Sequence, residues 1–179
     1  MKSVLISIRP QWVEKIVSGK KTIEVRKTAP KEVSFKAYIY CSYGDMKTNY
    51  YLKGRGKVIG EFFCDKVYSI KNQGSRFSVA DEEQRVTNEI ACQSCLDYDD
   101  MVSYLGNKDG YGWHISDLKI YDKPRKLSEF YRPCSYSGIC YSCNRFRPNG
   151  TPNDKPNDFC DGEITRPPQS YMFVEEVEQ

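Results

Sequence analysis

The chain has 179 residues, of which 39% are hydrophobic, 13% aromatic and 28% charged, and its mean hydropathy is -0.67. This length fits one ordinary domain over residues 1–179. The charge content argues against a membrane protein, and the aromatic content argues against a disordered chain. The apolar start, residues 1–8, is too short for the hydrophobic region of a signal peptide and is broken by Arg9 and Pro10. We therefore expect a cytoplasmic protein.

The net charge is +3, because 27 basic residues outnumber 24 acidic ones, but this charge is unevenly distributed. Residues 1–36 contain nine basic and three acidic residues, so this segment carries +6 and the remainder carries −3. A basic segment on a near-neutral body is typical of a protein with an anionic partner, with nucleic acid as the first candidate. A solvated charged face has the same composition, so charge alone leaves both interpretations open.

A short helix is expected after the first strand. Pro10 suits the first turn of a helix, and Gly19 supplies a stop at its end. Four apolar residues share one face of this helix, which predicts that they pack on a core. They are Trp12, Val13, Ile16 and Val17.

The rest of the chain alternates between strands and short helices. Helices are expected around residues 81–90 and over 97–105, where Met101, Val102 and Leu105 lie on one side. Strands interleaved with two or three short helices predict a small mixed β-barrel or an α+β domain. β-branched runs and polar–apolar alternation place the strands at 3–9, 22–26, 35–41, 58–70, 110–121 and 171–175.

The strongest local signal is a charged cluster on the strand over 22–26. Strand alternation puts Glu24 and Arg26 on one face, and it separates Lys21 from them unless the preceding turn rotates the lysine back. A glutamate between two cations stays ionised and orients both, which suits the binding of a phosphate or a base edge. The alternative is an ion-pair ladder on the protein surface, which contributes under about 1 kcal/mol to stability.

The spacing Gly19-x-Lys21-x-x-Glu24-x-Arg26 resembles the signature of the ASCH domain, a family of PUA-like β-barrels. The likeness extends through residues 58–62 and 110–130 to the segment Arg166-Pro167-Pro168-Gln169-Ser170-Tyr171, which resembles a closing motif of one family branch. A cysteine-containing insertion precedes that motif. The resemblance implies an α+β fold, a small mixed β-barrel with two or three short helices. Residues 71–95 and 131–163 look like insertions.

The resemblance also implies an RNA-binding or regulatory module with a cleft beside the first helix. Lys21, Glu24 and Arg26 would lie in this cleft, and tyrosine or tryptophan residues near its mouth would stack on bases. No nucleotide cofactor is expected. The residues expected to contact RNA or a nucleotide-like ligand are Arg9, Lys21, Glu24, Arg26, Gln169, Ser170 and Tyr171.

Two other functions stay open. One bacterial branch that is similar in this motif hydrolyses N4-acetylcytidine with a lysine, a threonine nucleophile and a downstream glutamate. Its lysine corresponds to Lys21, but its threonine falls on Glu24, and a carboxylate does not replace a hydroxyl nucleophile because its acyl product would be an anhydride. If the chain is an amidohydrolase, Lys21 and Glu24 are the candidate catalytic residues. The other alternative is a non-catalytic adaptor that binds a protein through the cysteine-rich insertion.

Four of the eight cysteines lie in a segment that lacks the aliphatic residues needed for its own core. Cys134, Cys140, Cys143 and Cys160 are the expected ligands of a structural zinc ion, which thiolates bind tetrahedrally. Disulfides or unliganded thiols are the alternatives, and the pair Cys92 and Cys95 could instead complete a zinc site with Cys140 and Cys143. Cys41 and Cys64 are expected to be idle thiols in strands. The single histidine, His114, has a strand position that argues against a catalytic pair with a cysteine.

Overall fold

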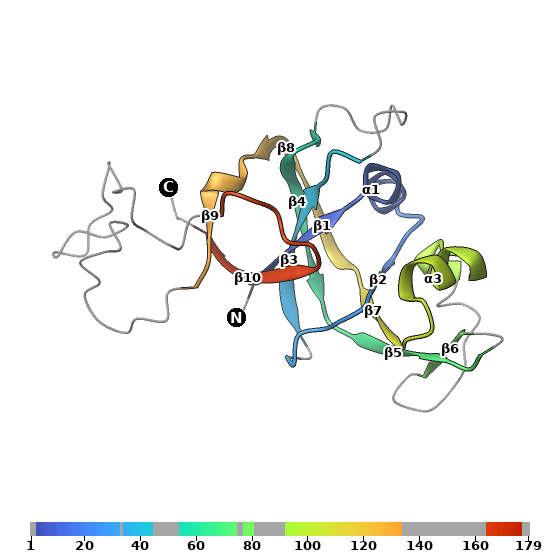
Figure 1. Ribbon diagram of the computed structural model, residues 1–179. Coiled ribbons are helices and arrows are strands. Elements are labelled where there is room, and N and C mark those ends of the chain that lie inside the picture. Colours follow the sequence, from blue (N-terminus) through green and yellow to red (C-terminus); the bar gives the residue numbers. More distant parts are fainter. Residues whose placement is uncertain are drawn as a thin grey trace, which may run out of the picture.

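The computed structural model describes residues 3–32, 34–44, 54–74, 77–80, 92–133 and 164–176 (Figure 1). In chain order the elements are β1 (Ser3–Ile8), α1 (Pro10–Val17), β2 (Ile23–Arg26), β3 (Phe35–Cys41), β4 (Lys57–Cys64), β5 (Val67–Asn72), β6 (Phe77–Ala80), α3 (Tyr98–Leu105), β7 (Gly110–His114), β8 (Ser116–Arg125), the 3-10 helix η2 (Leu127–Glu129), β9 (Phe130–Tyr131) and β10 (Tyr171–Glu176).

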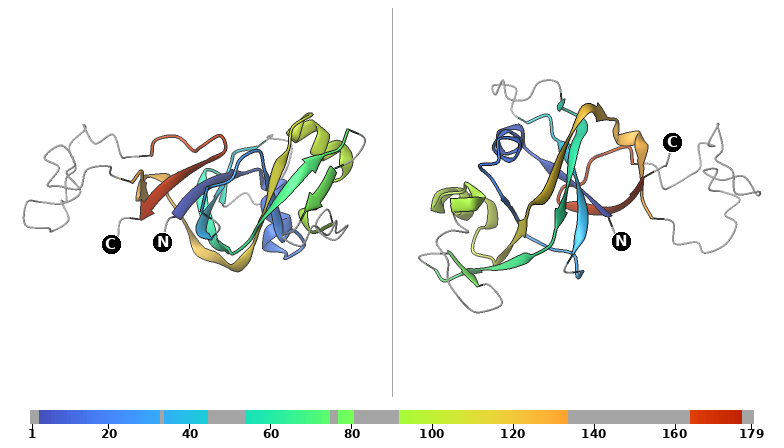
Figure 2. Two further views of the ribbon diagram at one scale, coloured as in Figure 1. Left: turned by 90° about the horizontal axis from the view of Figure 1, so that it is seen from below. Right: turned by 180° about the vertical axis from the view of Figure 1, so that it is seen from behind.

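The strands form two sheets that curl into an open half-barrel (Figure 2). The larger sheet has the order β8-β4-β3-β1-β10-β9, and the smaller has the order β2-β7-β5-β6. β1 and β3 pair in parallel, and the other strand pairs are antiparallel. This mixed sheet with short helices confirms the α+β class predicted from the sequence.

Two long segments pass from one sheet into the other. β4 continues into β5 after Asp65 and Lys66, and β7 continues into β8 after Ile115. The two corners are joined, because the backbone N–H of His114 donates to the Lys66 carbonyl at 2.9 Å. The sequence predicted a single strand over 58–70, whereas the structure divides it at this corner. Asp65 and Lys66 form this corner without a glycine or proline, which are the residues that usually indicate the end of a strand in a sequence.

The main core lies between the two sheets and α1. Trp113, on β7, is fully buried at its centre and packs edge-on against Phe35 and Tyr171, with ring centres 4.9 and 5.5 Å apart. Its neighbour His114 lies at the strand position expected from the sequence, where its Nδ1 is 2.6 Å from Asp65 Oδ1. A second cluster packs on the other side of the larger sheet around Leu5 and Phe130. These two clusters hold β1, and a third cluster around Ile23 and Val25 holds β2. Both strands contribute to the site described below.

Helices α1 and α3 form where the sequence predicts them, but each buries fewer apolar residues than expected. In α1, Val13 and Ile16 are buried, whereas Trp12 is partly exposed and Val17 is 38% exposed. In α3, Met101 and Leu105 are buried, but Val102 is exposed. Each helix has only two turns and lies at the edge of the sheets, so only its central stripe contacts the core.

Several predictions concern residues outside the described ranges. The helix expected around 81–90 and the four candidate zinc ligands Cys134, Cys140, Cys143 and Cys160 are among them. Within the described ranges, no helix is long and apolar enough to cross a membrane.

Candidate functional site

A cleft of about 530 Å³ opens between α1, β2, α3 and the segment before β10. In Figure 1, β2 runs between α1 and α3. Its residues Glu24, Val25 and Arg26 line the cleft, and we call this part of the lining the floor. The Ser7 hydroxyl donates to the Pro168 carbonyl at 2.7 Å. This bond holds the segment before β10 against β1. The side chains that line the cleft are those of Ser7, Ile8, Arg9, Gln11, Trp12, Lys21, Glu24, Val25, Arg26, Ser42, Leu96, Asp100, Ser103, Tyr104, Pro167, Pro168 and Gln169.

β2 turns its two charged residues toward the cleft. It pairs with β7 on one side, and Ile23 and Val25 pack in an apolar cluster with Ile70 and Leu105. Glu24 and Arg26 therefore share the opposite face, as strand alternation predicts. Glu24 is only 7% and Arg26 only 4% exposed, so the cluster is not a surface ion-pair ladder.

Lys21 precedes β2 and joins the same cluster. The turn after α1 is held by the Lys21 backbone N–H, which donates to the Lys15 carbonyl at 2.9 Å. This turn brings Lys21 Nζ to 3.5 Å from Glu24 Oε2, and Nζ donates to the Ser94 carbonyl at 2.6 Å. The turn thus supplies the rotation that strand alternation alone does not give. The sequence offered no signal for Ser94, because residues 71–97 are polar and weakly patterned.

Arg26 holds the other side of the Glu24 carboxylate. Its Nε lies 3.3 Å from Glu24 Oε1 but is not aligned to donate a hydrogen bond. Its Nη2 donates to the Ser7 carbonyl on β1 at 2.7 Å. The guanidinium group is therefore fixed between β1 and β2. It has five N–H donors, so N–H groups that Ser7 does not use can donate to a ligand in the cleft. Two cations and one carboxylate leave one net positive charge at the cleft floor.

Burial sets the electrostatics of Lys21. Desolvation lowers the pKa of its ammonium group from the ordinary value, and the attraction of the Glu24 carboxylate opposes that shift. A buried cation is stable only while its partners compensate for the lost hydration. An anionic group or a carbonyl oxygen of a ligand would add to that compensation, so the floor favours such groups.

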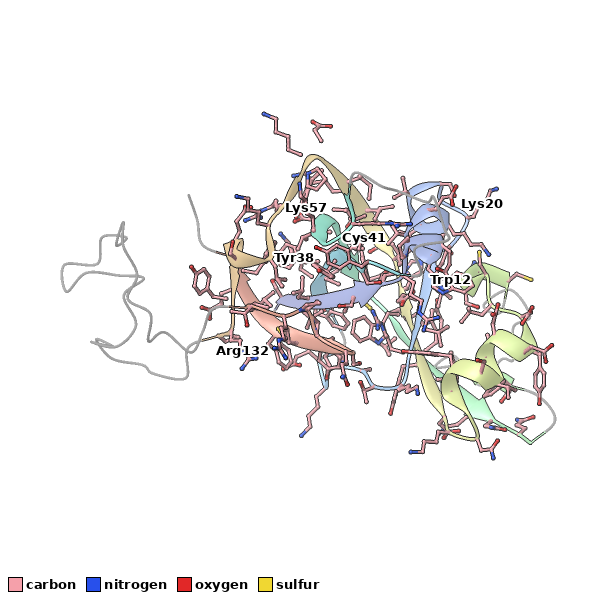
Figure 3. All side chains as sticks on the ribbon, turned by 45° about the horizontal axis from the view of Figure 1, so that its top comes forward. Trp12, Lys20, Tyr38, Cys41, Lys57 and Arg132 are labelled. Carbon is pink, nitrogen blue, oxygen red and sulfur yellow. The ribbon has the colours of Figure 1, made fainter. Side chains whose placement is uncertain are left out.

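Aromatic side chains line the walls above this floor. Figure 3 shows Trp12 on α1, on the side toward α3. Lys15 Nζ and Lys21 Nζ lie 4.7 and 5.3 Å from the centre of the Trp12 ring. Tyr104, from α3, also lines the cleft, and Lys27 Nζ lies 5.2 Å from its ring centre. The sequence placed Trp12 on the apolar face of the first helix, and in the structure Trp12 both packs against the main core and lines the cleft.

The remaining predicted ligand-binding residues divide into two groups. Arg9 and Gln169 line the cleft. Ser170 does not, and its hydroxyl lies 3.2 Å from the Thr28 hydroxyl. Tyr171 is the first residue of β10 and packs on Trp113 in the main core. Only the part of the closing motif before β10 therefore reaches the cleft.

The described cysteines are unpaired thiols. Burial raises the pKa of Cys41 to about 11 and that of Cys64 to about 12, so neither forms a thiolate at neutral pH. This supports the expectation that both are idle. Cys92 is exposed and Cys95 is partly exposed. No group of three or more potential metal ligands occurs within the part of the chain that the structure describes.

No family model and no curated protein sequence matches the chain. Solved structures of ASCH from Zymomonas mobilis are similar to the chain. One has 20% sequence identity and a TM-score of 0.51, over 97% of this chain and 88% of that chain. The chain has the ASCH fold. Two mutant structures of the same protein, one with tyrosine replaced by phenylalanine and one with serine replaced by alanine, match with 21% and 22% identity.

Both mutant structures give TM-scores of 0.50, with coverage of 71% and 70% of this chain and 77% and 75% of theirs. The ASCH fold, predicted from the combined motifs at residues 19–26, 58–62, 110–130 and 166–171, is thus confirmed. In this ASCH fold the carboxylates that line the cleft are Glu24 and Asp100.

Proposed function

We propose that this chain binds RNA through one nucleotide unit held in the cleft, and that a free nucleotide-like ligand enters the same site. The observation that carries this proposal is the buried Lys21–Glu24–Arg26 cluster at the floor of a cleft with aromatic walls. A volume of about 530 Å³ falls within the usual range for small-molecule sites and suits one nucleotide rather than a duplex.

Each part of the cleft matches one part of a nucleotide. Trp12 and Tyr104 offer flat faces for stacking, which contributes about 1–3 kcal/mol per base in single-stranded complexes. Lys21 and Arg26 donate to carbonyl or anionic oxygens, while Glu24 accepts from an exocyclic amino group. Outside the floor, Arg9 is exposed at the start of α1 and belongs to the +6 segment, which supports contacts with neighbouring phosphates.

The test is binding of short single-stranded RNA, measured by fluorescence anisotropy at low and moderate salt. Trp12→Ala should weaken binding at least about tenfold through lost stacking. Arg9→Ala should weaken it and reduce the salt dependence. Lys123→Ala, which removes an exposed charge from β8 away from the cleft, is the matched control and should change little. Equal affinity of all three variants and the parent chain would contradict the proposal.

The buried Lys21 also favours a second function, a small amidohydrolase that acts on a modified nucleoside such as N4-acetylcytidine. Burial lowers the pKa of Lys21, so at a given pH a larger fraction of this lysine than of an exposed one is deprotonated and able to accept a proton. In such an enzyme Glu24 would act as general base through a water molecule. The assay is release of acetate from N4-acetylcytidine. Turnover that disappears in Lys21→Met would rank this function first, and an intact substrate after hours would exclude it for that nucleoside.

A further inference from the structure

A cysteine-containing turn contacts Lys21 from behind the cleft lining. Residues 92–94 are helical, and the Cys95 backbone N–H donates to the Cys92 carbonyl at 3.0 Å. Cys95 has a φ of 54°, in the left-handed region that residues with a β-carbon rarely adopt. Such a conformation persists only where neighbouring contacts hold it in place.

The contacts that hold this turn are bonds to residues 20–22. The Thr22 backbone N–H donates to the Gln93 carbonyl at 3.0 Å. Lys21 Nζ donates to the Ser94 carbonyl, and the Cys95 thiol donates to the Lys20 carbonyl at 3.3 Å. Three successive residues of the turn thus bind three successive residues before β2. We call this arrangement the floor clamp, residues 92–95 on residues 20–22.

The same turn brings the two cysteines within reach of each other. A hydrogen bond from residue i+3 to residue i is that of a turn, in which the two α-carbons lie within about 7 Å. Disulfides join cysteines whose α-carbons are about 4.4–6.8 Å apart. Both thiols are accessible, because Cys92 is exposed and Cys95 is partly exposed. The spacing and the exposure therefore suit a disulfide within the turn.

We propose that Cys92 and Cys95 form a reversible disulfide on oxidation by a peroxide, and that this opens the floor clamp. The Cys92 thiol gives up its proton and its sulfur attacks one oxygen of hydrogen peroxide, the O–O bond breaks, and the leaving hydroxide takes up that proton, so that a sulfenic acid and one water molecule result. The Cys95 sulfur then attacks the sulfenic sulfur, the S–S bond forms, and the hydroxyl group leaves as a second water. The two thiols lose two electrons and two protons, which the peroxide takes up. A low-molecular-weight dithiol reverses the reaction.

Disulfide formation affects the cleft because Cys95 loses the S–H group that donates to the Lys20 carbonyl. A disulfide sulfur carries no proton, so Cys95 can no longer donate to the Lys20 carbonyl, and its sulfur must turn toward Cys92. The intervening Ser94 carbonyl shifts with the turn and leaves Lys21 Nζ with less compensation for its burial. Oxidation therefore changes the ionisation and position of Lys21. Only the effect on RNA affinity rests on the proposed function.

The experiment treats the reduced full chain with hydrogen peroxide and maps disulfides by mass spectrometry of peptides. We expect a Cys92–Cys95 bond that a dithiol removes. NMR of the Lys21 ammonium group should show a different titration in the oxidised form. Cys95→Ser keeps a donor for the Lys20 carbonyl but cannot form the bond, so peroxide should leave its Lys21 titration unchanged. Cys92→Ser is the second control.

The outcomes separate the inference from the proposed function. RNA affinity should fall about tenfold on oxidation, the size expected for one charge-assisted hydrogen bond. If Lys21 responds to oxidation but neither form binds RNA, the inference stands and the proposed function fails. Cys92 and Cys95 that stay reduced, pair with other cysteines or hold a metal ion would overturn the inference. So would a Cys92–Cys95 bond that leaves Lys21 unchanged.

Discussion

Glu24 is the residue on which the cleft floor depends. Its carboxylate is the one anionic partner that Lys21 and Arg26 share among the described residues, and all three side chains are buried. Removing one member of such a group leaves uncompensated buried charge, which costs about 3–5 kcal/mol. Glu24→Gln should therefore destabilise the chain by about 3 kcal/mol at neutral pH, measured by denaturant unfolding.

The stability loss caused by Glu24→Gln should depend on pH, because Lys21 titrates differently in the folded and unfolded chain. Burial already lowers the pKa of Lys21 below its ordinary value of 10.5, so below that value the unfolded chain binds more protons than the folded one. Stability from this group therefore rises with pH toward 10.5. Glu24→Gln lowers the pKa further, so its stability loss should shrink as the solution becomes alkaline. In a Lys21→Met background the shrinkage should vanish. In the chain that keeps Lys21, a stability loss of Glu24→Gln that does not change with pH would contradict this account.

The sequence predicted part of this residue-scale arrangement. Strand alternation placed Glu24 and Arg26 together, because a period of two is a local property of the backbone. It did not place Lys21, whose position depends on the turn after α1, nor the Ser94 carbonyl that accepts from it. The acceptor is a backbone carbonyl 73 residues from Lys21, and the types and spacing of side chains in the sequence do not predict such a contact. Burial of the cluster was likewise missed, since charged residues are usually exposed.

At the scale of elements, α3 determines one wall of the cleft. Asp97 caps this helix, because its side chain accepts a hydrogen bond from the Asp100 backbone N–H at 2.7 Å. The helix carries Asp100, Ser103 and Tyr104 into the cleft lining. The cap therefore supports both the stability of α3 and the shape of the site.

We predict that Asp97→Ala lowers the free energy of unfolding by about 1 kcal/mol, the usual contribution of such a cap. Asp97→Asn should retain most of it, because the amide oxygen still accepts. Asp99→Ala is the matched control, since it removes a carboxylate from the same first turn without a cap bond. Thermal and denaturant unfolding measure all three. An equal loss in Asp97→Ala and Asp99→Ala would assign the effect to the helix dipole and not to the cap.

Most elements were predictable where a local signal marks them. The helix over 97–105 has a capping residue and buried positions four residues apart at Met101 and Leu105. The strand over 58–70 was predicted without its break, because the corner at Asp65 and Lys66 is set by contacts with β7 and β8. The Ser116 hydroxyl donates to the Phe63 carbonyl at 2.8 Å across that corner. Such a bend comes from tertiary packing, which a single segment does not encode.

At the scale of the whole molecule, the cleft is built from segments that are far apart in the chain. Its walls come from residues 7–12, 21–26, 96–104 and 167–169. The ASCH resemblance predicted which segments belong to one barrel, and the structural match confirms that fold. It did not predict that α3 closes the cleft, because α3 follows the segment interpreted as an insertion. The fold could thus be predicted from the sequence, but most of the cleft lining could not.

The cysteine-rich insertion carries the last prediction, which concerns metal. Its flanks are anchored, since Phe130 and Ile164 are buried in the second apolar cluster. The residues between them include four cysteines, four prolines and few aliphatic side chains. Ordering a chain costs about 1–2 kcal/mol per residue, which these side chains do not offset. A zinc ion bound by four thiolates would supply that stabilisation.

We therefore expect about one zinc ion per chain, bound by Cys134, Cys140, Cys143 and Cys160. Elemental analysis of protein purified under reducing conditions measures it directly. Changing Cys140 and Cys143 to serine should release the metal and make the insertion sensitive to protease. The barrel should survive, because all three apolar clusters lie outside the insertion. Cys92→Ser should keep the zinc, which separates this set from one completed by Cys92 and Cys95. Protein without metal, with an insertion equally protease-resistant before and after strong reductant, would leave these four cysteines without the assigned role.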